Sequence, residues 1–84
     1  MTRNEQLEVI KRWIKCLYDN DYNNAVFDTY NEYCDWKDKE RLTDSRENLQ
    51  VILNDDAFIS EVLDVELEMD MMPSIMEDLA NWEE

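Results

Sequence analysis

The chain contains no glycine in its 84 residues, whereas glycine makes up about 7% of an average protein. Glycine reaches positive φ at little energetic cost, and tight β-hairpins and phosphate-binding loops both depend on such positions. Helices joined by short turns of Asn and Asp satisfy this restriction better than a β-sandwich or a barrel does. The absence of glycine, together with a single proline at Pro73, therefore predicts a mostly all-α fold.

The length and the apolar content set the size of this fold. A chain of 84 residues forms one domain near the lower limit of what a single core can stabilise. Its apolar fraction of 44% is close to that of folded globular proteins. We therefore expect one acidic helical domain over residues 1–84. It would be a compact bundle of four to five short helices, with an extended or short β segment at about residues 63–71.

The first helix is predicted over about residues 3–18. Thr2 and Glu5 have the spacing of an N-terminal capping box. Apolar side chains recur on one face at Leu7, Ile10, Ile14 and Leu17. Four bases against two acids give residues 1–18 a net charge of +2. We interpret this segment as a core helix whose bases offset acids elsewhere in the fold, and the alternative is a basic binding site.

The second helix is predicted from about Tyr22 to Cys34, followed by a short helical turn around Trp36. Its apolar residues follow the repeat of an amphipathic helix at Tyr22, Ala25, Val26, Thr29, Tyr30 and Tyr33. Carboxylates occupy the opposite side of the same segment. This pattern predicts that the tyrosine-rich face packs into the core.

Two further helices are predicted between residues 44 and 63. Asp44 and Glu47 are spaced as a helix start, and Asn54 can end that helix. Asp55 or Asp56 would cap the helix that follows. The apolar residues of these two helices are Leu49, Ile52, Leu53, Phe58, Ile59, Val62 and Leu63.

Residues 63–71 carry a different signal, because apolar residues there alternate with acids from Leu63 to Met71. A period of two normally indicates a strand with one dry face. A strand needs a paired neighbour, and no other stretch of the chain alternates comparably. Continuation of the helix is the alternative, since Glu and Met are good helix formers. We favour a helix that ends at about Leu63 and is followed by an extended stretch.

The last helix is predicted to begin at Pro73 and Ser74, with Glu77 at capping-box spacing from Ser74. Its apolar face would consist of Ile75, Met76, Leu79 and Trp82.

The charge of the chain is concentrated in its C-terminal half. The net charge is −14, from 22 acids and 8 bases, and there is no histidine. All eight bases lie at or before Arg46, so residues 1–46 carry −2 and residues 47–84, with twelve acids, carry −12. Such a surface repels nucleic acid and anionic lipid. We therefore expect no direct binding to nucleic acid or membrane, and we expect a basic protein partner.

The sequence lacks the usual signatures of a catalytic or metal site. General acid–base chemistry most often uses histidine, and there is no glycine-rich phosphate loop and no zinc signature. Asp19, Asp21 and Asn23 match three positions of a calcium-binding EF-hand loop. Asn24 and Tyr30, however, replace its glycine and its bidentate glutamate. We expect no enzymatic activity, no catalytic residue, no cofactor and no metal site.

The two cysteines indicate a reducing compartment. Cys16 and Cys34 have no CxxC spacing, and the N-terminus lacks the apolar segment of a secretory signal. Thiols of this kind are usually small buried side chains. No apolar run approaches the ~20 residues of a membrane span. We therefore expect a cytoplasmic protein without a structural disulfide.

The amount of negative charge is comparable to that of DNA. Duplex DNA carries one charge per ~1.7 Å of axis, so fourteen charges correspond to about 24 Å of duplex. A compact chain of this length has a diameter of about 30 Å. Solubility alone seldom needs more than about eight charges on a small domain. The excess indicates a functional acidic surface.

Two short stretches resemble a known class of proteins. These are NNAVFDTY at Asn23–Tyr30 and DVELEMDMMP at Asp64–Pro73, the latter ahead of an acidic last helix. With the size, charge and helical content, they make the chain similar to small acidic phage proteins that mimic DNA and block host restriction or CRISPR enzymes. The chain is shorter than the anti-restriction type and lacks its long acidic tail. The resemblance implies an inhibitor, often dimeric, that occludes the DNA-binding groove of a defence nuclease in the host cytoplasm.

These observations lead to one hypothesis and one alternative. The hypothesis is a non-enzymatic DNA mimic that places carboxylates where a basic nucleic-acid-binding protein expects phosphates, and a homodimer would extend this surface. The expected binding residues of the C-terminal half are Asp55, Asp56, Glu61, Asp64, Glu66, Glu68, Asp70, Glu77 and Asp78. A second expected cluster consists of Asp28, Glu32 and Asp35. The alternative is an immunity protein, an antitoxin or an acidic subunit that binds a basic protein partner.

Overall fold

The computed structural model describes residues 1–20, 23–43 and 45–82. Its elements in chain order are α1 (Arg3–Asp19), α2 (Asn23–Lys37), the 3-10 turn η1 (Arg46–Asn48), α3 (Leu49–Asn54), α4 (Asp56–Glu68) and α5 (Met72–Trp82). These residues contain no strand, so the expected all-α fold is confirmed. No helix among them is both long enough and apolar enough to cross a membrane.

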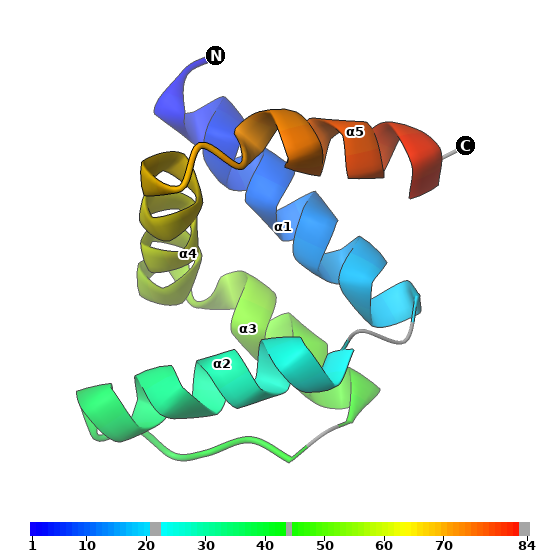
Figure 1. Cartoon of the computed structure of the whole chain (residues 1–84). Coiled ribbons are helices and arrows are strands. Elements are labelled where there is room, and N and C mark those ends of the chain that lie inside the picture. The colour runs from blue at the N-terminus through cyan, green and yellow to red at the C-terminus, as the bar shows by residue number, and fades with distance from the viewer. Residues whose placement is uncertain (21–22, 44, 83–84) are drawn as a thin grey trace.

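Helix α1 is the central element of the fold (Figure 1). It packs against α2, α3, α4 and α5. Its first turn is closed by the predicted capping box, in which the Glu5 N–H donates to the Thr2 hydroxyl at 3.2 Å and the Thr2 N–H donates to the Glu5 carboxylate at 3.1 Å. The hydrogen bond from the Thr2 N–H to the carboxylate, followed by the Thr2 side chain, holds the pKa of Glu5 below its ordinary value. The prediction for this helix is confirmed within one residue at its C-terminus.

The core receives side chains from every α-helix. Its most completely enclosed members are Ile10, Ile52, Ile59, Leu63, Ile75 and Cys34. Five of these six are branched aliphatic residues that the helical repeat had placed inside. The sixth, Cys34, is a buried thiol, Cys16 is half-buried, and neither belongs to a disulfide. Apolar burial around α1 is therefore the main stabilising contribution.

Residues 63–71 do not form the extended stretch that we favoured. Helix α4 continues to Glu68 and ends in a turn at Met69 and Asp70. Leu63 is fully buried, whereas the side chains after it on the alternating pattern are exposed, with Val65 at 46%, Leu67 at 39% and Met69 at 64%. With no second strand among the described residues, a strand here would leave its backbone groups unpaired. The helix satisfies them internally, and the prediction of an extended segment was wrong.

Aspartates take the place that glycine usually has at helix C-termini. Asp38 and Asp70 both have left-handed backbones, with φ of 56° and 57°. After each of them a backbone N–H reaches back to close the helix, from Lys39 to the Cys34 carbonyl and from Met71 to the Glu66 carbonyl, both at 2.9 Å. This is the Schellman arrangement, in which glycine is the commonest left-handed residue. Asp is one of the few other residues that tolerate this conformation.

Helix α2 departs from its predicted length and face. It extends to Lys37, so the separate turn expected around Trp36 is the last turn of this helix. Val26, Tyr30 and Tyr33 are buried as predicted, but Ala25 and Thr29 are exposed. Phe27 and Cys34, which the predicted face left out, are buried in their place. The predicted start at Tyr22 lies outside the described residues.

The remaining boundaries follow the predictions closely. Asn54 ends α3, and Asp55 is the N-cap of α4, where its side chain accepts a hydrogen bond from the Phe58 N–H. The expected start at Asp44 lies outside the described residues. Helix α5 begins at Met72, so Ser74 is inside the helix and not at its cap. Pro73 lies in the first turn, where its missing N–H costs no hydrogen bond.

Candidate functional site

The nine carboxylates predicted in the C-terminal half do not all face solvent without a partner. Asp56 lies 3.9 Å from the Lys11 ammonium, and Asp64 lies 3.0 Å from the Arg3 guanidinium. Both bases belong to α1, so this helix does offset acids elsewhere in the fold, as we interpreted it. Asp56 and Asp64 are therefore partly neutralised within the chain, so these two predicted binding residues already have a basic neighbour in the fold.

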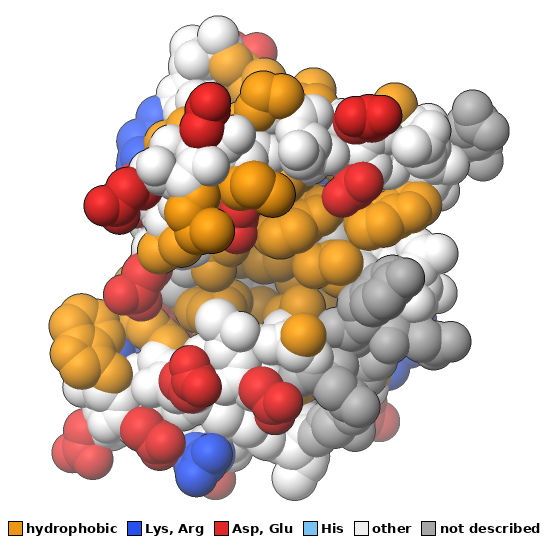
Figure 2. Space-filling view, in the orientation of Figure 1, with side chains coloured by type: hydrophobic (Ala, Val, Ile, Leu, Met, Phe, Trp, Pro, Cys, Tyr) orange, Lys and Arg blue, Asp and Glu red, His pale blue; other side chains and the backbone are white. Residues whose placement is uncertain are grey.

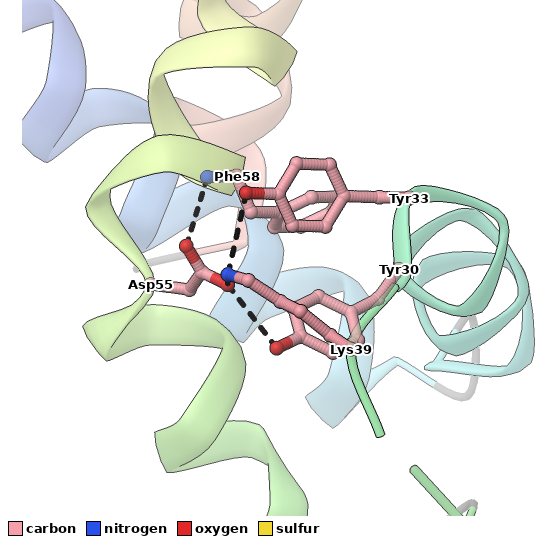
Figure 3. Close-up of polar contacts among 5 residues, drawn as sticks. All are labelled: Tyr30, Tyr33, Lys39, Asp55 and Phe58. Atoms are coloured by element: carbon pink, nitrogen blue, oxygen red, sulfur yellow. Dashed lines mark hydrogen bonds and ion pairs between the residues drawn. The ribbon is translucent and has the colours of Figure 1, made fainter. Parts of the chain in front are cut away.

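Asp55 is the clearest correction to the predicted surface. Only 11% of its side chain is exposed, and one of its oxygens lies 2.9 Å from the Lys39 ammonium. The Tyr30 hydroxyl donates to the same oxygen at 3.2 Å, and the Phe58 N–H donates to the other oxygen at 3.1 Å (Figure 3). Asp55 thus joins α2, the segment after α2 and the start of α4. It is a structural carboxylate and not one that a partner could reach.

The contacts of Asp55 change the pKa values of its cluster. Partial burial would raise the pKa of Asp55, but the hydrogen bonds from Lys39, the Phe58 N–H and Tyr30 outweigh it and hold this pKa below its ordinary value. The hydrogen bond to Asp55 raises the pKa of Lys39, and burial raises the pKa of Tyr30. At neutral pH the cluster is therefore a carboxylate, an ammonium and a neutral phenol.

Replacing Asp55 by alanine is expected to lower the free energy of unfolding by about 2 kcal/mol. About 1 kcal/mol of this comes from the lost helix cap, and the rest from hydrogen bonds to a charged group. Asp55→Asn, which keeps a capping side chain, should cost about half as much. The control is Asp56→Ala, whose side chain is 92% exposed and which should change stability by less than about 0.5 kcal/mol. Urea unfolding at pH 7 measures all three.

The pH dependence of the Asp55→Asn effect has a defined sign. Because the folded-state pKa of Asp55 is lowered, its stabilising contribution is complete above the unfolded value of about 3.9 and is lost as the pH falls through the folded value. The difference between the wild type and Asp55→Asn should be constant above about pH 5 and should shrink below about pH 4. A difference that stayed constant down to pH 2 would contradict a charged role for Asp55.

Six predicted carboxylates remain without an ion pair in the part of the chain that the structure describes. They lie on α4, on the turn after it and on α5, at Glu61, Glu66, Glu68, Asp70, Glu77 and Asp78. Glu66 and Asp78 are half-buried, and the other four are exposed. The last turn of α4 carries no basic residue. Its carboxylates thus lie at the negative end of the helix dipole, which is unfavourable for the helix.

The second predicted cluster lies on α2. Asp28, Glu32 and Asp35 are all exposed, and Asp35 lies 3.8 Å from Arg41. Glu32 faces a depression that Glu61 and Glu66 of α4 also line. The two predicted clusters therefore meet across this depression. They do not form one continuous outer face.

This depression is part of an apolar groove between α2 and α4. One portion, of about 330 Å³, is lined by Thr29, Glu32, Tyr33, Trp36, Phe58, Glu61, Val62, Val65 and Glu66. A second portion, of about 170 Å³, shares Thr29, Phe58, Val62 and Glu66 with the first and extends to Trp13, Ile14, Leu17, Ala25 and Val26. We call the two portions together the α2–α4 groove. Figure 2 shows its hydrophobic floor in a hollow that has carboxylates on both margins.

Aromatic side chains from the two walls of the α2–α4 groove pack against one another. The Phe58 ring lies 5.0 Å from the Tyr30 ring and 5.5 Å from the Tyr33 ring, measured between centroids. Phe58 and Tyr33 also line the hollow, together with the smaller side chains of Val62 and Thr29. The groove was not predicted from the sequence, although the mixed stripe of apolar and small residues on α2 was a signal of it.

The arrangement is chemically suited to binding. Apolar side chains can be buried on the floor of the α2–α4 groove, and its carboxylates can accept hydrogen bonds from Lys or Arg. Among the described residues no three His, Cys, Asp or Glu side chains come together as a group that could hold a metal ion. Asp19, from the EF-hand-like pattern, is paired with Arg46, and Asp21 lies outside the described residues.

Comparison of the chain with protein-family models, with curated proteins and with solved structures finds no match.

Proposed function

We propose that this chain is a non-enzymatic inhibitor that acts as a DNA mimic in the cytoplasm. Its carboxylates would occupy the nucleic-acid-binding groove of a basic protein, such as a restriction or CRISPR nuclease of a host cell. The binding surface would consist of the unpaired acids of α4 and α5, with those of α2 beside the α2–α4 groove. The chain would need no cofactor or metal for this role.

The observation that carries the proposal is the position of acids where they disfavour the fold. Glu68 and Asp70 lie at the C-terminal end of α4 with no base in the last turn, where negative charge costs about 0.3–1 kcal/mol. The left-handed backbone suits Asp at position 70, but it suits the uncharged Asn equally, so stability gives no reason for the charge of either residue. The longest dimension of the molecule is 32 Å, and its net charge of −14 amounts to about one charge per 2.3 Å. The value for duplex DNA, ~1.7 Å, is similar.

The proposal is tested by competition with DNA. Purified restriction and CRISPR nucleases are incubated with the chain and with a labelled duplex substrate, and DNA binding and cleavage are measured from about 50 to 300 mM salt. We expect at least one nuclease to be inhibited, with the inhibition weakening steeply as salt rises. Inhibition should be relieved by excess duplex. A chain that bound these enzymes without displacing DNA, or with salt-independent affinity, would contradict mimicry.

The alternative is an acidic interaction module, similar in role to an immunity protein or an antitoxin. The α2–α4 groove favours it, because an apolar floor is not needed to imitate a phosphate backbone. Both proposals require a basic partner, so electrostatic attraction alone does not separate them. Displacement by duplex DNA does, because a toxin or partner subunit held in the α2–α4 groove would not be released by it.

A further inference from the structure

The α2–α4 groove is long enough for a short helix to lie along one of its walls. Its α2 wall runs from Ala25 to Trp36, which is twelve residues and therefore eleven steps, or about 16 Å, of helix. Its α4 wall is formed by residues three and four positions apart, from Phe58 to Glu66. An occupant that runs along the α2 wall can therefore contact it over about three helical turns.

The α2 wall contains apolar and small residues that the core of this chain leaves exposed. Ala25 and Thr29 continue the stripe of Val26, Tyr30 and Tyr33, yet both are exposed. Trp36, at the end of the same wall, is 67% exposed, and Val65 faces it from α4 as a further exposed apolar residue. Exposed aromatic and apolar residues gathered in a concave site are typical of a protein-binding surface.

The charged residues that line the α2–α4 groove are all acidic. Glu32 lines one wall, and Glu61 and Glu66 line the other. None of the three has an ion pair within the described residues, and no Lys or Arg is among the lining residues. Lys37, outside the lining, places its ammonium 4.0 Å from the centre of the Trp36 ring. An occupant must therefore combine an apolar face with positive charges along its two edges.

We infer that the α2–α4 groove binds a basic amphipathic helix of a partner protein. The apolar face of that helix covers the floor at Phe58 and Val62, and its Lys and Arg side chains pair with Glu32 on one side and with Glu61 and Glu66 on the other. A second copy of this chain is a poor occupant, because two molecules of net charge −14 repel each other. The inference rests on the proposed function only in requiring a basic partner.

The test uses a synthetic peptide of about 15 residues, long enough to span the α2–α4 groove as a helix. It contains only Leu and Lys, with Leu at helical spacing on one face, and a peptide of the same composition in scrambled order is its control. Titration calorimetry gives the affinity, and the fluorescence of Trp36 and Trp13, which line the groove, reports the location. We expect the amphipathic peptide to bind at least about tenfold more tightly than the scrambled one.

Two matched variants separate groove binding from general attraction between charges. Val65→Lys places a positive charge in the lining of the groove, whereas Leu67→Lys places it on the same helix at an exposed residue outside that lining. We expect Val65→Lys to weaken binding of the amphipathic peptide at least about tenfold and Leu67→Lys by about twofold or less. Circular dichroism verifies that both variants remain folded.

Three outcomes would overturn the inference. The first is equal loss of affinity in Val65→Lys and Leu67→Lys, which would indicate diffuse charge attraction. The second is equal binding of the scrambled peptide. The third is a dimer of the chain alone that Val65→Lys dissociates, which would make a second copy the occupant. Failure of DNA mimicry would look different, since no nuclease would then be inhibited while the peptide still bound in the groove.

Discussion

Leu63→Ala is expected to lower the free energy of unfolding by about 3 kcal/mol, whereas Leu67→Ala, one turn later on α4, should lower it by less than about 1 kcal/mol. Leu63 is fully buried and Leu67 is 39% exposed. A buried Leu→Ala change removes apolar contacts and leaves a cavity, at a typical cost of 2–5 kcal/mol. Alanine is at least as good a helix former as leucine, so helix propensity does not contribute to either loss.

Urea unfolding of the two variants measures this difference. Leu63 and Leu67 are four positions apart and share one face of α4, so the difference comes from their burial, which ends between the two residues. Equal losses would therefore contradict the position at which α4 leaves the core. For a domain of this size, whose total stability is on the order of 5 kcal/mol, Leu63→Ala should also lower the melting temperature by more than 10 °C.

The sequence predicted the structure correctly where a single local pattern was present and no second pattern overlapped it. Thr2 and Glu5 form the capping box that their spacing predicted, and α1 follows with its apolar face inside. Asp55, one of the two adjacent aspartates predicted as the cap, is the N-cap of α4. Each of these features depends on residues within one turn of each other, and such local interactions can be read from spacing alone.

The sequence was insufficient where two periods overlapped. In residues 63–71 every second residue is apolar, but the same residues include Glu, Leu and Met, which favour helix. The outcome depended on whether another strand was present to receive the backbone hydrogen bonds, which is a property of the whole fold. In α2 the predicted stripe was correct in its centre at Tyr30 and Tyr33. Its margin at Ala25 and Thr29 faces the α2–α4 groove.

The candidate site was the least predictable part. Glu32 and Glu61 are 29 positions apart in the sequence, and only the packing of α2 and α4 around aromatic rings brings them to one depression. Conversely, Asp55 and Asp56 are adjacent and were assigned together to the acidic surface. One of them is a mostly enclosed cap, with 11% of its side chain exposed, and the other is 92% exposed. Net charge along a sequence therefore predicts how acidic a surface is, but not which carboxylates belong to it.

The ion pairs are unevenly distributed over the described part of the molecule. Of the bases in the described residues, Arg3, Lys11, Lys39, Arg41 and Arg46 lie within 4 Å of carboxylates. These contacts involve α1, Asp56 and Asp64 of α4, and the segments around α2. The helices α4 and α5 contain no Lys or Arg of their own. Repulsion between the acids at the C-terminal end of α4 and on α5 therefore opposes folding.

The triple variant Glu68→Gln, Asp70→Asn and Glu77→Gln is expected to bind a partner more weakly and to be more stable than the wild type. If these residues contact a nuclease, each lost charge pair costs about 1 kcal/mol, so affinity should fall about 100-fold. The same changes relieve charge repulsion and the unfavourable helix dipole at the end of α4, and should raise the free energy of unfolding by about 1 kcal/mol. Asn is suited to the left-handed backbone of residue 70. Competition binding and urea unfolding measure the two effects.

A matched control for this triple variant is available in the same chain. Asp38→Asn, Glu40→Gln and Glu47→Gln change the net charge from −14 to −11 as well, and Asp38 has the same left-handed backbone after α2 that Asp70 has after α4. If long-range attraction alone held the partner, both variants would lose affinity equally. A large loss confined to the α4–α5 variant, accompanied by a gain in its stability, is the result expected of acids that serve binding at the expense of the fold.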